Sequence, residues 1–457
     1  MLKLDISLKE IAALYHKLVA VDESDPLVTL VTDTRQLQKG DCFLCLKGER
    51  FDGHEFAAQA LEQGASFVIY EKERVSSELP GLQVADTNKF LGKLALFWRQ
   101  KVNPLAFAIT GSNGKTSTKE ILAALFETLY EGKVVKTSKN LNNQFGVPFT
   151  LLELQTDTRV LVIEAGMNQP GEIALLSSYI EPDHCLLVSI AGAHLGNLGS
   201  VEAIAREKID LISSMRKGGK LFLPEKITCK DILLAKAREQ GATVVETGSE
   251  HFENITYGAE KTQFTYEQKA YELPLPGPHQ FENFCLAFSA FAMVAEQQQL
   301  HNALADLPAM AFAAGRLRRL ETAGGFFIWD DTYNANVASF KAGVSTITAQ
   351  KADRLLVAMG AMAELGEFTQ REHTELVQWF KTQGVEFLVF SSADQSLAQQ
   401  VEAAWGRQDR LLLLDGSDDS FARAAAKLKQ VLKAGDDILI KGSRSAKMER
   451  LVELLKD

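Results

Sequence analysis

The most informative part of the chain reads Leu105-Ala-Phe-Ala-Ile-Thr-Gly-Ser-Asn-Gly-Lys-Thr-Ser-Thr-Lys-Glu120. The continuous apolar run Leu105–Thr110 predicts a buried strand, and the apolar periodicity after Lys115 predicts a helix. The glycine-rich turn between them can curl backbone N–H groups around phosphate oxygens at the positive end of the helix dipole. Lys115 supplies a point charge for the outer phosphates, and the Thr116 hydroxyl can ligate Mg²⁺.

We therefore predict that this turn binds a nucleoside triphosphate. The residues assigned to the phosphates are Thr110, Gly111, Ser112, Asn113, Gly114, Lys115, Thr116 and Ser117. A glycine-rich turn that binds nothing is the plain alternative. A GTPase would carry a guanine-reading Asn/Thr-Lys-x-Asp motif after a strand, and the sequence has none. ATP-driven enzymes and non-catalytic ATP-binding modules remain.

Similar apolar runs recur along the chain with helical stretches between them, as in a parallel sheet with crossover helices. The predicted strands are Leu27–Val31, Cys42–Leu46, Ser66–Tyr70, Val160–Ile163, Cys185–Ile190, Lys220–Leu223, Phe326–Trp329, Arg354–Met359, Glu386–Phe390, Arg410–Leu414 and Asp436–Ile440. We predict an α/β fold with three domains. They are a small α/β domain at 1–103, a central phosphate-loop domain with a mainly parallel sheet at 104–314, and a Rossmann-like domain at 315–457.

Composition agrees with such a globular protein. The 457 residues fit about three domains of ~150 residues, and 46% hydrophobic with 24% charged residues is ordinary. A net charge of −10 argues against a nucleic-acid partner. Five cysteines form no even disulfide framework, and Cys42-Phe-Leu-Cys45 alternates like a strand. Without a signal-peptide core or an apolar run long enough to span a bilayer, we expect a cytoplasmic monomer with reduced thiols.

Two polar residues follow predicted central strands. Glu164 comes directly after Val160–Ile163, and His194 lies just beyond Cys185–Ile190. Because functional groups gather at the carboxyl ends of the strands of a doubly wound sheet, both should reach the edge that carries the phosphate loop. A carboxylate and an imidazole beside bound phosphates suggest Mg²⁺ ligation. A helix-terminus carboxylate and a loop histidine are the structural alternatives.

Lys208 is unusual on physical grounds. Val201–Ser214 predicts a helix, and Lys208 lies on its apolar face in line with positions 201, 204 or 205 and 212. A buried lysine is costly unless it is paired, deprotonated or modified. A lysine that snorkels to solvent at a domain edge is the alternative.

Further polar clusters lie where ligand-facing loops are expected. The Pro-rich turn before the apolar helix Cys285–Ala295 brings His279 and Asn283 to i, i+4 spacing if the helix begins early. Arg316 suits a phosphate facing an interdomain cleft, with a solvated basic patch as the alternative. Two polar loops each follow a predicted strand: Asp330-Asp-Thr-Tyr-Asn334-Ala-Asn336 and Lys441-Gly-Ser-Arg444-Ser-Ala-Lys447.

With these motifs in this order, the chain resembles the Mur ligases, the family that builds the stem peptide of peptidoglycan, over nearly its whole length. The resemblance also includes Ser138-Lys-Asn140-Leu-Asn-Asn143-Gln-Phe-Gly146-Val-Pro148. Asp33-Thr34-Arg35, Lys39-Gly-Asp41 and Gly48–His54 resemble the uridine-binding N-terminal domain of the last two ligases of the pathway. The loops at 330–336 and 441–444 resemble the member that adds D-alanyl-D-alanine.

The resemblance implies a role for each matched residue. Lys115, Glu164, His194 and Lys208 form the catalytic group, and Thr116, Glu164, His194 and a carbamylated Lys208 hold the metal. Asn283, Arg316 and Asp331 contact the nucleotide. The implied substrate contacts are Thr34, Arg35, Lys47, Gly48, Phe51, Asp52, Gly53, His54, Asn140, Asn143, Asn334, Asn336, Lys441, Ser443 and Arg444.

The resemblance also implies the reaction. With ATP and Mg²⁺, the enzyme would add D-alanyl-D-alanine to UDP-N-acetylmuramoyl-tripeptide through an acyl phosphate, in cytoplasmic synthesis of peptidoglycan precursors. The alternatives are the preceding amino-acid-adding ligase, a folylpolyglutamate synthetase-like enzyme and a non-catalytic ATP-binding partner protein. The loop Gly360–Glu367 receives no role.

Overall fold

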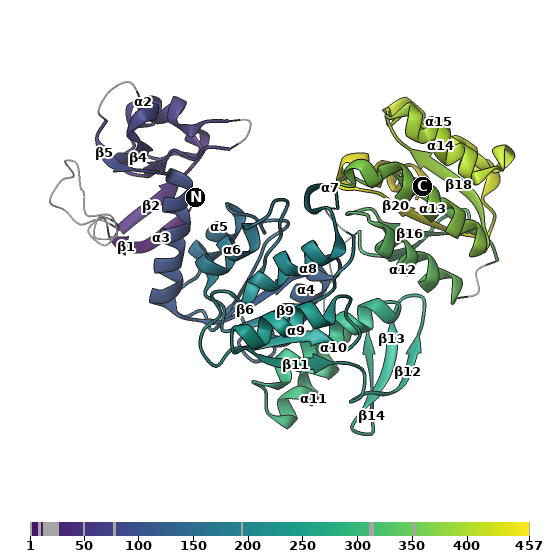
Figure 1. The fold of residues 1–457 in the computed structure, drawn as a ribbon, viewed down its shortest axis with the longest axis horizontal. Helices are drawn as coiled ribbons and strands as arrows, with labels where there is room; N and C mark the ends of the chain where they lie inside the picture. Colours follow the sequence, from purple (N-terminus) through teal and green to yellow (C-terminus); the bar gives the residue numbers. More distant parts are fainter. Residues whose placement is uncertain are drawn as a thin grey trace.

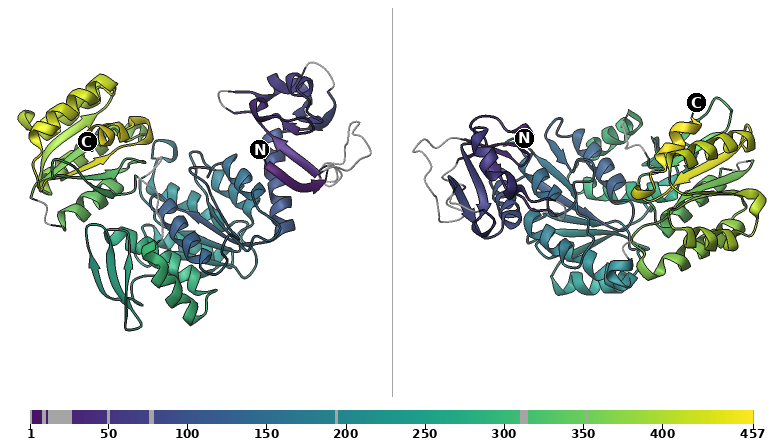
Figure 2. Two further views of the ribbon diagram at one scale, coloured as in Figure 1. Left: turned by 180° about the vertical axis from the view of Figure 1, so that it is seen from behind. Right: turned by 90° about the horizontal axis from the view of Figure 1, so that it is seen from above.

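The structure is a computed structural model, and it describes residues 2–7, 11, 27–48, 51–75, 79–192, 195–309, 315–350 and 353–456. A five-stranded sheet lies near the N-terminus, a six-stranded and a three-stranded sheet in the middle, and a second six-stranded sheet near the C-terminus. Figure 1 and both views in Figure 2 show the first and last of these sheets on opposite sides of the central part. The predicted three-part α/β fold is confirmed, whereas the borders at residues 103 and 314 stay predictions.

The N-terminal sheet is mostly parallel. Its strands are β1 (Leu2–Ser7), β2 (Leu27–Val31), β3 (Cys42–Leu44), β4 (Phe67–Glu71) and β5 (Gly81–Val84). Only the pair β1–β2 is antiparallel. Cys42 and Cys45 are both buried, and burial raises the pKa of the Cys45 thiol to about 12. Both cysteines are therefore part of the hydrophobic core, and their thiols are protonated. This agrees with the structural role that their strand-like alternation predicted.

The central sheet is parallel throughout. Its strands are β6 (Leu105–Thr110), β7 (Val134–Lys136), β8 (Val160–Glu164), β9 (His184–Leu187), β10 (Lys220–Pro224) and β11 (Thr243–Thr247). The helices around it are α4 (Lys115–Glu127), α5 (Gly146–Leu152), α6 (Glu172–Ile180), α7 (Leu195–Leu198), α8 (Val201–Ile209), α9 (Lys230–Glu239), α10 (Pro278–Ala292) and α11 (Gln297–Asp306). The order β11-β10-β9-β6-β8-β7 places β6 between β8 and β9. The carboxyl end of β6 is thus a topological switch point, where ligands bind in such sheets.

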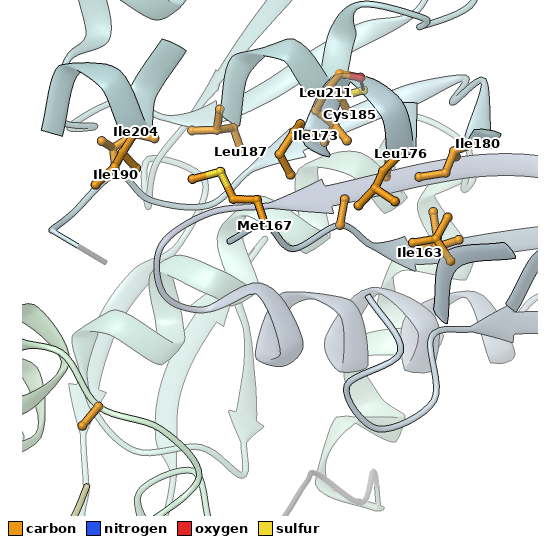
Figure 3. Close-up of a cluster of buried hydrophobic side chains, with 14 of the residues drawn as sticks. Ile163, Met167, Ile173, Leu176, Ile180, Cys185, Leu187, Ile190, Ile204 and Leu211 are labelled. Carbon is orange, nitrogen blue, oxygen red and sulfur yellow. Dashed lines mark hydrogen bonds between the residues drawn. The ribbon is translucent and has the colours of Figure 1, made fainter. Parts of the chain in front are cut away.

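Both faces of this sheet are covered. Phe107 and Ile109 of β6 belong to a core that includes residues of α4 and α10. Ile163 and Leu187 belong to a second core with residues of α6 and α8, drawn in Figure 3. Because successive side chains point to opposite faces, a strand buried on both sides must be apolar at every position. That requirement explains why β6 could be recognised as a continuous apolar run.

A small antiparallel sheet follows β11 and was not predicted. It consists of β12 (Glu253–Tyr257), β13 (Thr262–Tyr266) and β14 (Lys269–Leu273). The rings of Phe252 and Phe264 pack against Phe281 and Phe284 on α10. α10 begins at Pro278, early enough for His279 and Asn283 to lie one turn apart.

The C-terminal sheet has the order β15-β16-β20-β17-β18-β19, and only β15–β16 is antiparallel. Its strands are β15 (Arg318–Glu321), β16 (Phe327–Asp331), β17 (Leu355–Gly360), β18 (Val385–Ser391), β19 (Leu411–Leu414) and β20 (Asp437–Lys441). Its helices are α12 (Val337–Thr348), α13 (Thr369–Thr382), α14 (Gln395–Trp405), α15 (Asp418–Val431) and α16 (Glu449–Leu455). Across the described ranges, no helix combines the length and apolarity that crossing a membrane requires.

Helix α3 (Thr87–Val102) joins the first sheet to the central part, and it packs against α5 and α6. Arg99 on α3 is fully buried. Its guanidinium donates to the Ile180 carbonyl at 2.8 Å, the Glu181 carbonyl at 3.1 Å and the Asp183 carboxylate at 2.9 Å. These bonds anchor α3 to the end of α6 and to the strand that follows.

We predict that Arg99→Ala lowers the free energy of unfolding by about 3–5 kcal/mol, because it leaves the Asp183 carboxylate and two carbonyls without their buried donor. Chemical denaturation and calorimetry measure the loss. The control is Arg423→Ala, because Arg423 and its ion-pair partner Asp419, one helical turn away, are both exposed. An equal effect of the two substitutions would contradict this account of Arg99.

Candidate active site at the phosphate loop

The turn between β6 and α4 has the glycines that a phosphate-binding loop needs. Gly111 and Gly114 have φ values of 157° and 80°. A Cβ at Gly114 would lie 2.3 Å from Oδ1 of Asn283 and 2.7 Å from Cγ1 of Val188. Any other residue at Gly114 would therefore force the loop away from α10. Two predicted nucleotide-binding residues, distant in the sequence, meet at this point.

The loop is fastened to the segment after β9. Ser189 Oγ accepts from the Asn113 N–H at 2.9 Å and donates to the Asn113 carbonyl at 3.0 Å. Ser112 Oγ donates to the Ala191 carbonyl at 2.9 Å. Lys115 Nζ donates back to the Gly111 carbonyl at 2.7 Å, and burial lowers the pKa of Lys115. The ammonium group thus lies over the glycine-rich turn.

Thr116 and Glu164 form the centre of the cluster, and both are buried. Thr116 Oγ donates to Glu164 Oε2 at 3.0 Å and accepts from Arg316 Nη2 at 2.9 Å. Arg316 also stacks on the ring of Tyr333, with 4.0 Å between its guanidinium carbon and the ring centroid. The predicted residues Thr116, Glu164 and Arg316 are therefore in contact, although Arg316 belongs to the C-terminal part.

The asparagine-rich stretch after β7 contributes a residue that sequence reasoning did not select. Asn142 Nδ2 donates to Glu164 Oε1 at 2.9 Å. Of the two asparagines assigned to the substrate, Asn140 is exposed, and Asn143 accepts from the Gly146 N–H at the start of α5. The stretch was identified correctly, but neighbouring asparagines cannot be told apart until the turn's geometry is known.

Lys208 on α8 is fully buried, which excludes the snorkelling alternative, and its Nζ has no hydrogen-bond partner among the described residues. Burial, followed by the nearby Lys115 charge, lowers the pKa of Lys208 well below its usual value. The carboxylates of Glu207 and Glu164 act in the opposite direction without outweighing these effects, and Glu207 accepts from the Gly171 and Ile173 N–H groups at 2.9 and 3.1 Å. Lys208 is a buried nitrogen without a bonding partner, close to the phosphate loop.

Three of the four predicted metal ligands, Thr116, Glu164 and Lys208, lie among the described residues. His194 lies outside the described residues, so its role stays a prediction. In the part of the chain that the structure describes, no group of three or more His, Cys, Asp or Glu side chains could hold a metal ion. Thr116 and Glu164 are the predicted metal ligands that the structure brings into contact.

Asp331 and Lys441 meet where β16 and β20 end. Lys441 is buried, and its Nζ lies 2.5 Å from Asp331 Oδ2 and 2.8 Å from the Asn334 carbonyl. Their charges reach His279 on α10, where burial dominates and lowers the pKa of the imidazole to about 4. Lys441 is thus already neutralised by Asp331, while the side chain of Asn334 is exposed.

The other residues assigned to the acceptor dipeptide also have protein partners. Asn336 Nδ2 donates to Asn113 Oδ1 at 2.7 Å, and its Oδ1 caps α12 by accepting from the Ser339 N–H at 2.9 Å. Ser443 Oγ donates to the Ala361 carbonyl at 2.5 Å, whereas Arg444 is exposed. Asn336 therefore connects the C-terminal part to the phosphate loop.

The residues assigned to the uridine end form a separate group in the N-terminal part. They include Thr34, Lys47, Gly48 and Gly53 along with Arg35, Phe51, Asp52 and His54. Lys47 and Asp52 form an isolated antiparallel β-bridge. Phe51 is 58% exposed, and Arg35 is exposed beside Asp33. His54 is buried: Nδ1 bonds to Asp52 and Nε2 accepts from the Glu71 N–H. His54 thus braces the loop, while Phe51 and Arg35 face solvent.

The loop Gly360–Glu367, which had no assigned role, contacts the central part. The Gly196 N–H of α7 donates to the Glu364 carbonyl at 2.9 Å. A Cβ at Gly366 would lie 2.8 Å from the Gly196 Cα, and Gly366 has a φ of 56°. Gly196 of the central part and Gly366 of the C-terminal part therefore touch backbone to backbone.

We predict that Gly366→Ala opens the interface between the central and C-terminal parts and lowers kcat/KM at least about tenfold, because positioning across a cleft is sensitive to small displacements. Steady-state rates and the radius of gyration from X-ray scattering measure the two effects. Gly384→Ala is a matched control, since Gly384 also has a positive φ, 77°, but no atom within 4 Å of an added Cβ. An equal loss of kcat/KM in the two variants would show that backbone strain at the substituted glycine, and not the contact with Gly196, causes the loss.

Comparison with known proteins agrees with this architecture. Models of the Mur ligase family, catalytic domain, of the Mur ligase middle domain, and of the Mur ligase, glutamate ligase domain match residues 28–99, 109–291 and 315–444. The UDP-N-acetylmuramoyl-tripeptide–D-alanyl-D-alanine ligase of Escherichia coli is 34% identical, over 94% of each chain. A crystal structure of MurF from Acinetobacter baumannii superposes with a TM-score of 0.88 at 27% identity, covering 99% of both chains. MurF from Thermotoga maritima, solved in complex with ADP, gives 0.79 at 26% identity over 94% of this chain and 97% of that one. The chain belongs to the Mur ligase family.

Proposed function

We propose that this chain is the ATP-dependent ligase that joins D-alanyl-D-alanine to UDP-N-acetylmuramoyl-tripeptide. The observation that carries the proposal is the contact of Arg316 with Thr116, which brings the C-terminal part onto the phosphate loop. A non-catalytic ATP-binding module would not need a buried carboxylate, an unpartnered lysine and an arginine from another domain at that loop. The E. coli relative, which aligns with this chain over 94% of both sequences, bears the name of this activity.

The reaction explains why such a site is needed. A carboxylate and an amine do not condense in water, so a carboxylate oxygen of the tripeptide first attacks the γ-phosphorus of ATP and ADP leaves. The amine of the dipeptide then attacks the carbonyl carbon of the acyl phosphate, inorganic phosphate leaves, and the amine nitrogen loses a proton. Phosphoryl transfer depends on positioning and charge neutralisation, which Lys115 and Arg316 can provide. Closure of the domains would protect the acyl phosphate from water.

Mg²⁺ fits the residues around Thr116. This ion prefers oxygen ligands and usually combines one or two carboxylates with phosphates and water. Glu164 and the Thr116 hydroxyl supply oxygens at the phosphate loop, and His194 is proposed as a further ligand. When bound, the ion would neutralise charge on the phosphate oxygens. Asn283, Arg316 and Asp331 are proposed to contact the nucleotide.

Lys208 is proposed to be a carbamate. Only a neutral amine reacts with CO₂, and burial favours the neutral form of this lysine. The amine nitrogen attacks the carbon of CO₂ and loses a proton, so the product is an anionic carbamate. This modification would give the buried Nζ, which has no hydrogen-bond partner among the described residues, a role beside a bound Mg²⁺ ion. The carbamate oxygens would add to those of Thr116 and Glu164 as ligands for the ion.

The UDP end of the first substrate is assigned to the N-terminal part. The exposed Phe51 ring offers a stacking surface for the base, and Arg35 and Lys47 offer cations for the diphosphate. All these residues come from one chain, so a monomer can carry a complete site. We place the enzyme in the cytoplasm, where ATP is available.

The central prediction concerns substrates. Phosphate release should require ATP, UDP-N-acetylmuramoyl-tripeptide and D-alanyl-D-alanine together, and mass spectrometry should find the pentapeptide product. Tripeptides ending in lysine and in diaminopimelate are both offered. Product from a UDP-muramoyl-dipeptide and a single diamino acid would assign the chain to the preceding ligase, and no turnover with any pair would support the non-catalytic alternative.

Lys208 gives a spectroscopic prediction. After incubation with ¹³C-bicarbonate and Mg²⁺, the protein should show a carbamate carbon signal that Lys208→Met lacks, because methionine has similar bulk but no amine. Phosphate release by Lys208→Met should fall at least about a hundredfold, as for the loss of a transition-state charge stabiliser. An identical signal in both proteins would rule out modification at this position.

A further inference from the structure

Lys119 is a buried lysine beside the phosphate loop, and the proposed function gives it no role. It lies on α4, one helical turn after Lys115, and is 1% exposed. Its Nζ donates to the Thr137 carbonyl at 2.7 Å and pairs with Glu120 Oε1 at 2.8 Å. Because a buried ammonium group is costly without such partners, these two contacts fix where the side chain lies.

Thr137 lies at a weakly held point of the central sheet. It directly follows β7, which has three residues and stands at the end of the strand order, paired with β8. Thr137 extends that pairing by one bond, from its N–H to the Val162 carbonyl at 3.2 Å. Since β7 has no neighbour on its other side among the described strands, the bond from Lys119 gives Thr137 a second connection, to α4.

The hydroxyl of Thr137 holds the backbone of Glu164. Its Oγ accepts from the Glu164 N–H at 2.8 Å, and both residues are buried. Thr137 therefore accepts a bond from α4 on its carbonyl and a bond from the end of β8 on its hydroxyl. Any shift of Thr137 moves the residue whose carboxylate accepts from Thr116.

The segment that leaves Thr137 also reaches the carboxylate of Glu164. Asn142, further along this segment, donates from Nδ2 to Glu164 Oε1 at 2.9 Å, whereas Thr116 on α4 donates to Oε2. The two carboxylate oxygens are thus held from two sides, by α4 and by the segment after β7. The bond from Lys119 to Thr137 ties these two sides together.

We propose that Lys119 is a positioning residue for the metal site, and that it acts through Thr137 on the orientation of Glu164. The proposal rests on the proposed function, in which Glu164 ligates Mg²⁺. Groups that hold a ligating carboxylate set its direction, and their loss typically weakens metal binding or activity about 10–100-fold. Lys119 thus serves the metal ion, while Lys115, one turn earlier on the same helix, serves the phosphates.

The test measures Mn²⁺ binding in the presence of ADP by electron paramagnetic resonance, so it requires no turnover. Lys119→Met and Thr137→Val should each raise the Kd for Mn²⁺ about tenfold, because each breaks one bond of the same connection. The double variant should show the same rise of about tenfold, since residues that act on one another do not have additive effects. Thr137→Ser keeps the hydroxyl and should bind Mn²⁺ as the wild type does.

Lys136→Met is the matched control. Lys136 also pairs with Glu120, but its side chain is 45% exposed. Its loss removes a cation from the same carboxylate and leaves the bond from Lys119 to Thr137 in place, so the Kd for Mn²⁺ should not change. The Kd for ADP without metal should be the same in every variant, because the phosphate loop keeps Lys115.

Three outcomes would overturn the proposal. A lower melting temperature of Lys119→Met with an unchanged Kd for Mn²⁺ would show a purely structural tie. A rise of about a hundredfold in the double variant would show that Lys119 and Thr137 act independently. An equal loss of ADP binding without metal would show that Lys119 supports the phosphate loop as a whole.

Two further measurements separate this proposal from those on which it rests. Glu164→Gln tests the metal assignment directly: if it binds Mn²⁺ as tightly as the wild type, Glu164 is not a ligand and the role of Lys119 falls with it. Ligation of D-alanyl-D-alanine by the wild type tests the proposed function without reference to Lys119. Failure of that ligation, with Mn²⁺ binding changed as expected, would overturn the substrate assignment alone.

Discussion

The oxygen of a single hydroxyl group, on Thr116, joins the main parts of this site. It donates to Glu164 at the end of β8 and accepts from Arg316 of the C-terminal part, while its own backbone lies in the first turn of α4. A hydroxyl can donate one hydrogen bond and accept others, so the same atom links a carboxylate to a guanidinium. Position and charge at the phosphate loop therefore depend on the central sheet and on the C-terminal sheet at once.

Cationic groups lie close to this hydroxyl. Lys115 and Arg316 lie beside the buried carboxylate of Glu164, and the amine of Lys208 is buried nearby. Burial makes every uncompensated charge costly, and the lowered pKa values of both lysines express that cost. A triphosphate would bring negative charge to Lys115 and Arg316, so cations that are costly to bury would favour its binding.

Sequence reasoning predicted most of the fold, because the strands that position the site are buried on both faces and so appear as apolar runs. It also brought together Thr116, Glu164, Asn283 and Arg316, since strand ends and loop glycines constrain where such residues can lie. It missed β12–β14, whose short strands are partly exposed, and Asn142, which only the turn geometry separates from its neighbours. It assigned Lys441 to substrate because the pairing with Asp331 joins residues on two strands that are distant in sequence. The contact of Gly196 with Gly366 could not be foreseen, because a contact between domains leaves no periodic pattern in the sequence of either.

The position of β20 in the sheet affects how the C-terminal part folds during its synthesis. β16 and β17 do not pair with each other; β20 lies between them and hydrogen-bonds to both. It is synthesised after β18 and β19, so a growing chain on the ribosome carries β16 and β17 with open edges until residues 437–441 emerge. Open edges of apolar strands invite association with other chains. A chain that ends or is cleaved before Asp437 would keep the phosphate loop. It would lack the strand that joins β16 to β17 in the C-terminal sheet. Translation through the last strand, rather than formation of the phosphate loop, is then the step that separates a working enzyme from an aggregation-prone fragment.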